Sequence, residues 1–121
     1  MIRRKEEISA TINENLLGGT GKVSFLDFLS REESNGAGRL FSILTLGKNA
    51  SVGWHRHSGD MEVYYIMEGT AKVQDNDNEP CLLHAGDVMI CNDGEGHAIE
   101  CHGDEDLKFL AIVLYTKQQQ L

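Results

Sequence analysis

Short apolar runs of about four to eight residues, bounded by Gly, Asn and Asp, recur along the whole chain. Such runs are typical of strands joined by turns, because helices need longer segments with a period of 3.6 residues. Turn-forming sequences separate the runs, so neighbouring strands are expected to pair antiparallel. The pattern predicts strands over residues 23–29, 39–46, 52–57, 62–67, 70–74, 81–84, 88–91, 97–101 and 107–115.

Evenly spaced short strands of this kind are typical of an antiparallel sandwich or barrel. The chain has 121 residues, 40% of them hydrophobic, which suits one domain with a single core. We therefore predict an all-β fold with its domain over residues 16–117 and a C-terminal tail over 118–121. Residues 1–15 form a weakly patterned N-terminal arm that could be extended, helical or frayed.

The net charge indicates which binding partners are not expected, and the cysteines indicate the cellular compartment. A formal net charge of −8 would repel nucleic acid and anionic membrane surfaces, so neither is expected as a partner. The charged N-terminus does not resemble a signal peptide, and the longest apolar stretch, 109–115, is too short to span a bilayer as a helix. Cys81, Cys91 and Cys101 form neither a disulfide framework nor a Cys-x-x-Cys pair, so we expect a reducing, cytoplasmic setting.

Four residues of metal-binding type have a spacing that could bring them together. His55 and His57 are two residues apart, so on a strand both imidazoles point to one face. A turn over 58–60 precedes Glu62, and antiparallel pairing would return its carboxylate beside the two imidazoles. His97 begins a later strand and can reach the same point from across a barrel. Taken singly, each is more commonly an ordinary polar residue, but together they suit one divalent Fe, Mn, Ni, Co or Zn ion.

The same residues resemble the motifs of the cupin family. Their spacing, closed by Gly69, matches the first motif, His-x-His-x4-Glu-x6-Gly. The segment from Gly86 to His97 resembles the second motif, Gly-x5-Pro-x-Gly-x2-His-x3-Asn, but Asn92 replaces the usual proline and Cys101 the usual asparagine. The resemblance implies a small antiparallel double-stranded β-helix, the cupin or jelly-roll barrel, that binds one divalent transition metal per chain.

The residues around the predicted metal are candidates for contact with a ligand. Counting by two places Tyr64 on the face of Glu62, and Ile99 and Cys101 on the face of His97. Tyr64 could donate a hydrogen bond to a ligand and Cys101 could be a soft group near the metal, or both could be ordinary barrel filling.

Arg39 is the best-placed cation for an anionic substrate, provided that its strand is regular and it shares a face with Phe41 and Ile43; otherwise it is a solvated strand end. The remaining histidines, His84 and His102, occupy no motif position and are treated as structural or exposed.

A six-coordinate ion with four protein ligands would leave about two positions open for water or for a substrate that chelates through two oxygens. We therefore expect a metalloenzyme acting on a small carboxylate or sugar, and the resemblance implies dioxygenase, decarboxylase or sugar isomerase or epimerase chemistry. A non-catalytic module that binds or senses a small ligand is the alternative. A closed structural zinc site is disfavoured because no cysteine is placed as a ligand.

The oligomeric state is predicted from the apolar strand over 23–29. If this strand lies at a sheet edge, pairing with a second copy would cover its free backbone groups, so we expect a homodimer.

Overall fold

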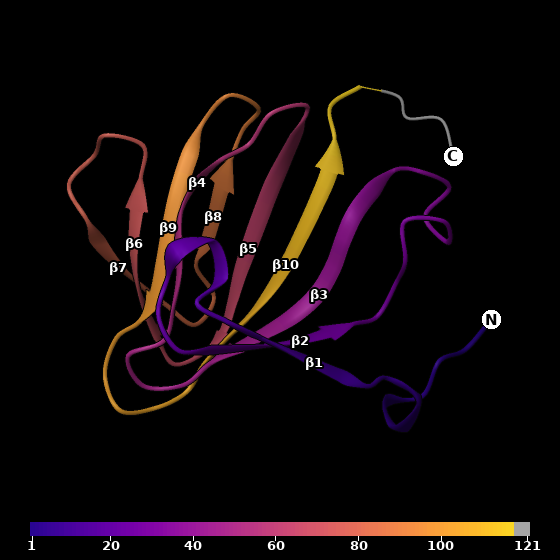
Figure 1. Cartoon of the computed structure of the whole chain (residues 1–121), viewed down its shortest axis with the longest axis horizontal. Coiled ribbons are helices and arrows are strands. Elements are labelled where there is room, and N and C mark those ends of the chain that lie inside the picture. Colours follow the sequence, from indigo (N-terminus) through magenta and orange to yellow (C-terminus); the bar gives the residue numbers. More distant parts are fainter. Residues whose placement is uncertain (118–121) are drawn as a thin grey trace.

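The computed structural model describes residues 1–117, and the predicted tail over 118–121 lies outside the described residues. Ten strands make up most of the fold (Figure 1). They are β1 (Ala10–Glu14), β2 (Lys22–Asp27), β3 (Gly38–Leu46), β4 (Ser51–Arg56), β5 (Asp60–Glu68), β6 (Thr70–Asp75), β7 (Cys81–His84), β8 (Val88–Cys91), β9 (Gly96–Cys101) and β10 (Leu107–Tyr115). Two single-turn 3₁₀ helices, η1 (Lys5–Glu7) and η2 (Leu16–Gly18), flank β1, and no α-helix occurs in residues 1–117.

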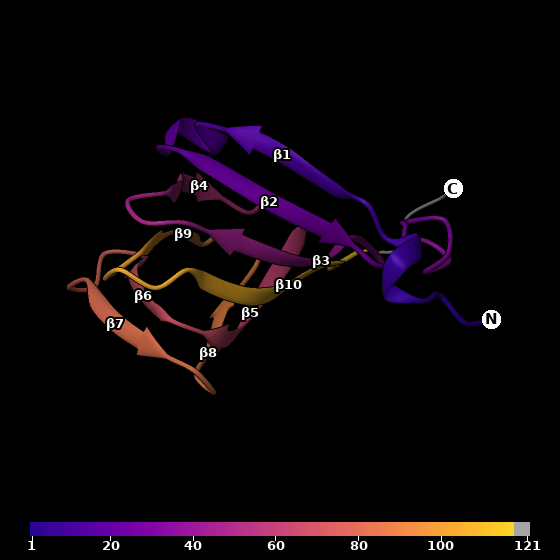
Figure 2. The ribbon, with the colours of Figure 1, turned by 90° about the horizontal axis from the view of Figure 1, so that it is seen from below.

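The strands form two antiparallel sheets, which confirms the predicted all-β class. One sheet has the order β1-β2-β3-β10-β5-β8 and the other has the order β4-β9-β6-β7. In Figure 2, β1 and β2 lie along one margin of the molecule, and β7 and β8 lie along the opposite margin. From β3 to β10 the chain changes sheet at every step except β6 to β7, and these crossings connect the two sheets around one interior.

The alternation of apolar residues along each strand fills that interior. On β10, Leu107, Phe109, Ala111 and Val113 are all buried and point inward. On β5 the inward positions are Glu62, Tyr64 and Ile66. Burying one large aliphatic or aromatic side chain stabilises a fold by roughly 1.5–3 kcal/mol, so the inward row of β10 alone is a major part of the core.

The N-terminal arm contributes a strand to the larger sheet. β1 pairs with β2 from Ala10 opposite Leu26 to Glu14 opposite Lys22. Because β2 lies between β1 and β3, the expectation that residues 23–29 form a sheet edge is wrong. Of the alternatives left open for residues 1–15, the extended one holds for β1. No apolar pattern marked it as a strand, because its five residues are all exposed.

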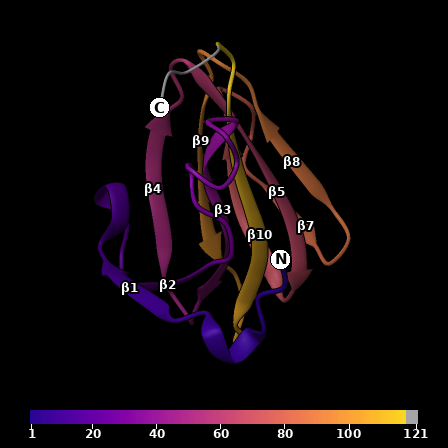
Figure 3. The ribbon, with the colours of Figure 1, turned by 90° about the vertical axis from the view of Figure 1, so that its right-hand side faces the viewer.

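Two loops and the end of β10 meet at one end of the barrel, at the top of Figure 3. The amide of His57 donates to the carbonyl of Glu95 (2.9 Å), and the amide of Gly94 donates to the carbonyl of His57 (2.8 Å). The amide of Gly59 donates to Oδ1 of Asp93 (2.9 Å), and the Thr116 hydroxyl donates to Oδ2 of the same carboxylate (2.7 Å). These bonds hold the β4–β5 and β8–β9 loops and the end of β10 together.

Within residues 1–117 there is no helix of the length and apolarity that crossing a membrane requires.

Candidate metal centre

Four side chains converge at this end of the barrel. The Nε2 atom of His97 lies 3.0 Å from Nε2 of His55, 3.3 Å from Nε2 of His57 and 2.9 Å from Oε1 of Glu62. The same Glu62 oxygen lies 3.1 Å from Nε2 of His57 and 3.7 Å from Nε2 of His55. The cluster could hold a metal ion, and its members are the four residues that the sequence spacing predicted as ligands.

Strand register brings the ligands together from both sheets. His55 on β4 lies directly opposite His97 on β9, and Glu62 projects inward from β5 in the other sheet. Between Val52 and His55 the β4–β9 pairing shifts by one residue, so two residues of β4 face a single residue of β9. Such a bulge changes which face a side chain points to, and here it lets both Val52 and His55 point inward.

The hydrogen bonds at the far ring nitrogens set the tautomers of two histidines. Nδ1 of His55 lies 2.8 Å from the carbonyl of Gly53, and Nδ1 of His57 lies 2.7 Å from Oδ1 of Asp60. A carbonyl or carboxylate oxygen only accepts, so each Nδ1 carries a proton. In the neutral ring Nε2 is then free to present a lone pair to a metal, and in the protonated ring Nε2 donates to Glu62. The Nδ1 of His97 is buried and makes no hydrogen bond to any described residue.

The donor set fits a first-row divalent metal. With bonds of about 2.1 Å, two ligand atoms at a right angle around an ion lie about 3.0 Å apart. The four nearest separations in the cluster, 2.9, 3.0, 3.1 and 3.3 Å, bracket that value. Three neutral imidazoles and a carboxylate are ligands that Mn, Fe, Co, Ni and Zn all accept, so the donors alone do not select one metal.

The electrostatics of the cluster favour an ionised Glu62. Burial alone would raise the pKa of this carboxyl, but hydrogen bonds with His55, His57 and His97 outweigh burial and hold the pKa far below its usual range. A hydrogen bond with Glu62 raises the pKa of His57 against the opposing effect of burial, and Asp60 adds to the rise. Burial lowers the pKa of His97 and so favours the neutral ring that a metal needs.

A buried carboxylate links Arg39 to this cluster. Asp60 is 6% exposed; one of its oxygens contacts His57, and the other accepts a hydrogen bond from Nε of Arg39 at 2.8 Å. Arg39 is the extra residue of a second bulge, because Val113 of β10 pairs with Leu40 while Leu114 pairs with Gly38. The strand is thus irregular at Arg39, and the bulge turns the side chain toward Asp60 instead of leaving it with Phe41 and Ile43 on the outer face.

Asp60 was not among the predicted site residues, although the sequence carries a signal for it. Asp60 is two residues before Glu62, so period-two counting places both carboxylates on the inward face of β5.

Three of the four candidate ligands open into a cavity of about 260 Å³. Arg39 and Tyr64 line it together with the side chains of His55, His57 and Glu62. The rest of its wall is aliphatic or aromatic and comes from η2, β2, β3, β4 and β10: Leu16, Leu17, Phe25, Leu40, Leu44, Val52 and Val113.

The other predicted residues are divided between this cavity and the core. The ring of Tyr64 stacks on the ring of His97 with centroids 4.9 Å apart, and burial, aided by the charge of Glu62, raises the pKa of Tyr64. Ile99 and Cys101 belong to the hydrophobic core and do not line the cavity. The thiol of Cys101 donates to the carbonyl of Glu105 at 3.1 Å. His84 and His102 are exposed and lie outside the cluster.

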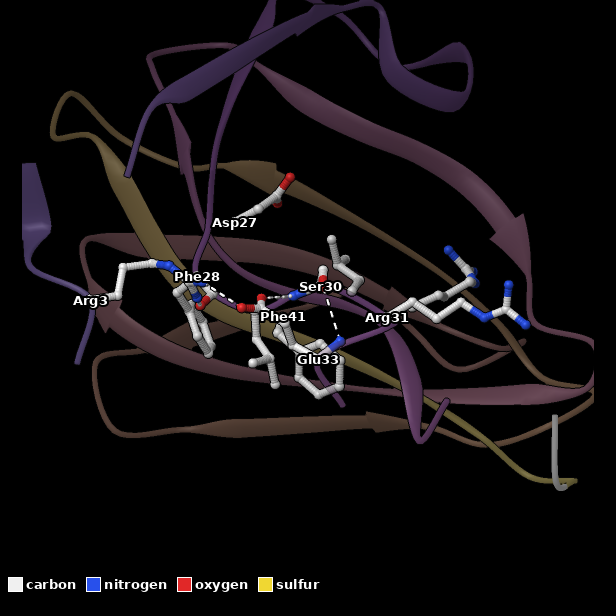
Figure 4. Close-up of a pocket in the computed structure, with 10 residues that line it drawn as sticks. Arg3, Asp27, Phe28, Ser30, Arg31, Glu33 and Phe41 are labelled. Carbon is white, nitrogen blue, oxygen red and sulfur yellow. Dashed lines mark hydrogen bonds and ion pairs between the residues drawn. The ribbon is translucent and has the colours of Figure 1, made fainter. Parts of the chain in front are cut away.

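A larger hollow of about 440 Å³ lies beside the outer face of β3, shown in Figure 4. Arg3 and Glu33 occupy it as an ion pair at 2.5 Å, and Arg3 also donates to the carbonyl of Phe28 at 2.7 Å. Glu33 in turn accepts a hydrogen bond from the amide of Ser30 at 2.9 Å. These groups satisfy one another, and none of the four clustered ligands lines this hollow, so the smaller cavity is the better candidate for function.

Two antiparallel sheets closed around three histidines and a glutamate define a class of small β-barrel proteins with an internal metal centre. The Cupin domain family matches residues 42–113, which is more than half of the chain. The chain therefore belongs to the cupin family.

Two comparisons with proteins from Thermotoga maritima extend over nearly the whole chain. The chain is 39% identical over 114 residues to an oxalate-binding protein, covering 94% of this chain and 93% of that protein. A crystal structure described as a predicted oxalate decarboxylase superposes with a TM-score of 0.90 at 37% identity, covering 95% of this chain and 99% of that one. A structure of oxalate decarboxylase matches with a TM-score of 0.68 at 25% identity, and there 98% of this chain covers 30% of the larger enzyme.

Proposed function

We propose that this cupin binds one divalent transition metal through His55, His57, Glu62 and His97, and uses it to hold a small carboxylate such as oxalate. The observation that carries the proposal is the convergence of four side chains of metal-binding type, three of which line a cavity large enough for a small molecule. The similarity to an oxalate-binding protein over almost the full chain supports the class of ligand.

A bound divalent ion would supply a positive charge and open coordination positions for carboxylate oxygens. The residues of the chain would provide the rest of the recognition. Asp60 holds the His57 ring in the tautomer that points Nε2 into the cluster. Arg39 places a guanidinium in the wall of the same cavity, where it can complement the charge of an anion.

Catalysis is the second candidate function, because a structural relative is described as a predicted oxalate decarboxylase. Decarboxylation replaces carbon dioxide with a proton, so it needs a group that can deliver one. Apart from the candidate metal ligands and Arg39, Tyr64 is the proton donor among the described residues that line the cavity. Burial raises the pKa of Tyr64. A tyrosine with a raised pKa is a hydrogen-bond donor and a weak acid, which favours binding over turnover.

Calorimetric titration of the manganese-loaded protein with oxalate tests the proposal. We expect saturable binding that disappears after chelation and in His97→Ala. An absence of heat with every small carboxylate, in protein shown to contain the metal, would contradict the proposed function. Measurement of formate and carbon dioxide in the same mixtures separates a binder from a decarboxylase.

We also propose that the protein is a homodimer that associates through the outer face of its larger sheet. Cross-strand pairs on this face align apolar side chains in two rows, Leu26–Ile43–Leu110–Tyr65–Val88 and Phe41–Ile112–Val63–Ile90. Tyr65, Val88 and Ile90 are about half exposed. Large exposed apolar patches mark contact sites. The two rows contain no carboxylate, so contact through them would limit the repulsion between two chains of charge −8.

Light scattering of Ile90→Glu tests this interface. We expect a dimer for the wild type and a monomer for the variant, because two glutamates would be buried against each other at the symmetric contact. Leu82→Glu is the control, since Leu82 is 44% exposed on β7 of the other sheet. A monomeric wild type, or an Ile90→Glu variant that remains dimeric, would contradict the proposal.

A further inference from the structure

The cavity above the metal ligands has a wall that a wholly polar ligand does not need. Most of its lining, apart from the ligand side chains, consists of aliphatic carbon from Leu16, Leu17, Leu40, Leu44 and Val52. Among the described residues Arg39 is the cation in this lining, and its Nε is already bonded to Asp60. A second charged group on a ligand would therefore lose water against an apolar surface, which is unfavourable without a partner.

We propose that the ligand of this site is a 2-oxo or 2-hydroxy carboxylate with a short apolar chain, an inference that rests on the metal-dependent carboxylate binding proposed above. The two oxygens of such a molecule can chelate a metal while its hydrocarbon chain contacts the leucine wall. Oxalate presents oxygens on every side and has no apolar surface to bury.

The volume of the cavity agrees with this class. At about 30 Å³ per water molecule, 260 Å³ corresponds to roughly eight or nine waters. A chelating head and a chain of two or three carbons fit within that space, whereas the space is larger than a single dianion needs.

The apolar wall over the site is a built feature of the fold. η2 lies against β4, and Figure 1 shows its coil over the strands of the smaller sheet. Any Cβ on Gly53 would lie 2.1 Å from the carbonyl oxygen of Leu17, so the close approach depends on glycine at that position. Leu17 itself has φ 53° and ψ 36°, a left-handed conformation that a leucine rarely adopts. The backbone thus holds Leu16 and Leu17 against the cavity at the expense of local strain.

Calorimetric titration of the manganese-loaded protein with oxalate, pyruvate, 2-oxobutyrate and 2-oxovalerate tests the inference. Each added methylene that enters the apolar wall should tighten binding about fourfold. We expect the affinity to rise along the three 2-oxo acids and to exceed that for oxalate at the longest chain.

Leu17→Asn is the informative variant, because asparagine tolerates the left-handed conformation while removing apolar surface. It should flatten the rise with chain length, because each added methylene then meets an amide in place of aliphatic carbon. Ile12→Asn is the matched control, since Ile12 is 63% exposed on β1 and does not line the cavity.

Two results would overturn the inference while leaving the proposed function in place. They are oxalate binding without tighter binding of the longer acids, and a rise with chain length that Leu17→Asn retains in full. If none of the four acids binds, the proposed function falls and the inference falls with it.

Discussion

Asp60 joins a charged residue at the cavity wall to a ligand of the metal site. It is buried, and it accepts hydrogen bonds from both His57 and Arg39. A carboxylate behind a ligating histidine fixes the ring orientation and raises the basicity of the nitrogen that faces the metal. Asp60 is therefore a positioning residue for the site.

Replacing this carboxylate should weaken metal binding without removing a ligand. We predict that Asp60→Ala lowers metal affinity about 10- to 100-fold, because His57 loses the partner that orients it. Competition with a coloured chelator measures the change. Asp27→Asn, an exposed carboxylate away from the cluster, should leave affinity unaltered. Equal affinities for wild type and Asp60→Ala would contradict the positioning role.

The three thiols should differ strongly in reactivity. Cys81 is exposed, whereas Cys91 and Cys101 are buried. Burial, aided by nearby carboxylates, raises the pKa of Cys91 to about 11, and burial also raises the pKa of Cys101. A higher pKa leaves less of the nucleophilic thiolate at pH 8. Titration with a thiol-reactive disulfide at pH 8 should show Cys81 reacting fast and the other two reacting only after unfolding; fast reaction of all three would contradict this burial.

At the scale of strands, the short apolar runs bounded by turn residues predicted every strand from β2 to β10, with small differences at the ends. It succeeded because most of these strands bury one face, which requires apolar residues there; β7 has no buried residue and was predicted from its apolar run and the turns beside it. The pattern did not predict β1, whose residues are all exposed. It also did not predict the bulges at Gly53 and Arg39, where one extra residue changes the side of the sheet to which the following side chains point. The four ligands were predictable because their spacing is local, except for His97, which needed the family motif.

The position of η2 depends on contacts that no local pattern reports. Gly19 packs closely against β4. A Cβ on Gly19 would lie 2.3 Å from the carbonyl oxygen of Ser51 and 2.8 Å from the amide nitrogen of Gly53. This packing is long-range in sequence, so the role of Leu16 and Leu17 in the cavity wall was not predictable from the run of residues alone.

The close contact of η2 with β4 can be tested by adding one methyl group. We predict that Gly53→Ala destabilises the fold by about 1–3 kcal/mol, because the new Cβ meets the Leu17 carbonyl and η2 must move. Gly47→Ala is the control; its nearest neighbour would be a carboxylate oxygen of Asp106 at 3.8 Å, so its change should stay within about 0.5 kcal/mol. Urea unfolding measures both, and equal midpoints would contradict the contact.

At the scale of the whole molecule, the candidate metal site bridges the two sheets. His55 and His97 belong to the four-stranded sheet, and Glu62 belongs to the six-stranded sheet. A metal held by these ligands would bind the folded chain and not the unfolded one, so it would stabilise the barrel by mass action.

Chelation should therefore lower the melting temperature. A hundredfold excess of metal over its dissociation constant adds about 2.7 kcal/mol, which corresponds to roughly 10 °C for a chain of this size. Differential scanning calorimetry with and without a chelator measures the shift. His97→Ala should melt at the same temperature in both conditions, and a wild type that is equally insensitive would contradict the bridging role.

The central claim, that His55, His57, Glu62 and His97 bind a metal, is tested most directly by the metal content of the purified protein. Elemental analysis after reloading with manganese should give close to one equivalent per chain in the wild type. His55→Ala and His97→Ala should each lose most of it, while His84→Ala, an exposed histidine outside the cluster, should keep it. Wild-type protein that is folded and cannot be loaded with any first-row divalent metal would contradict the account.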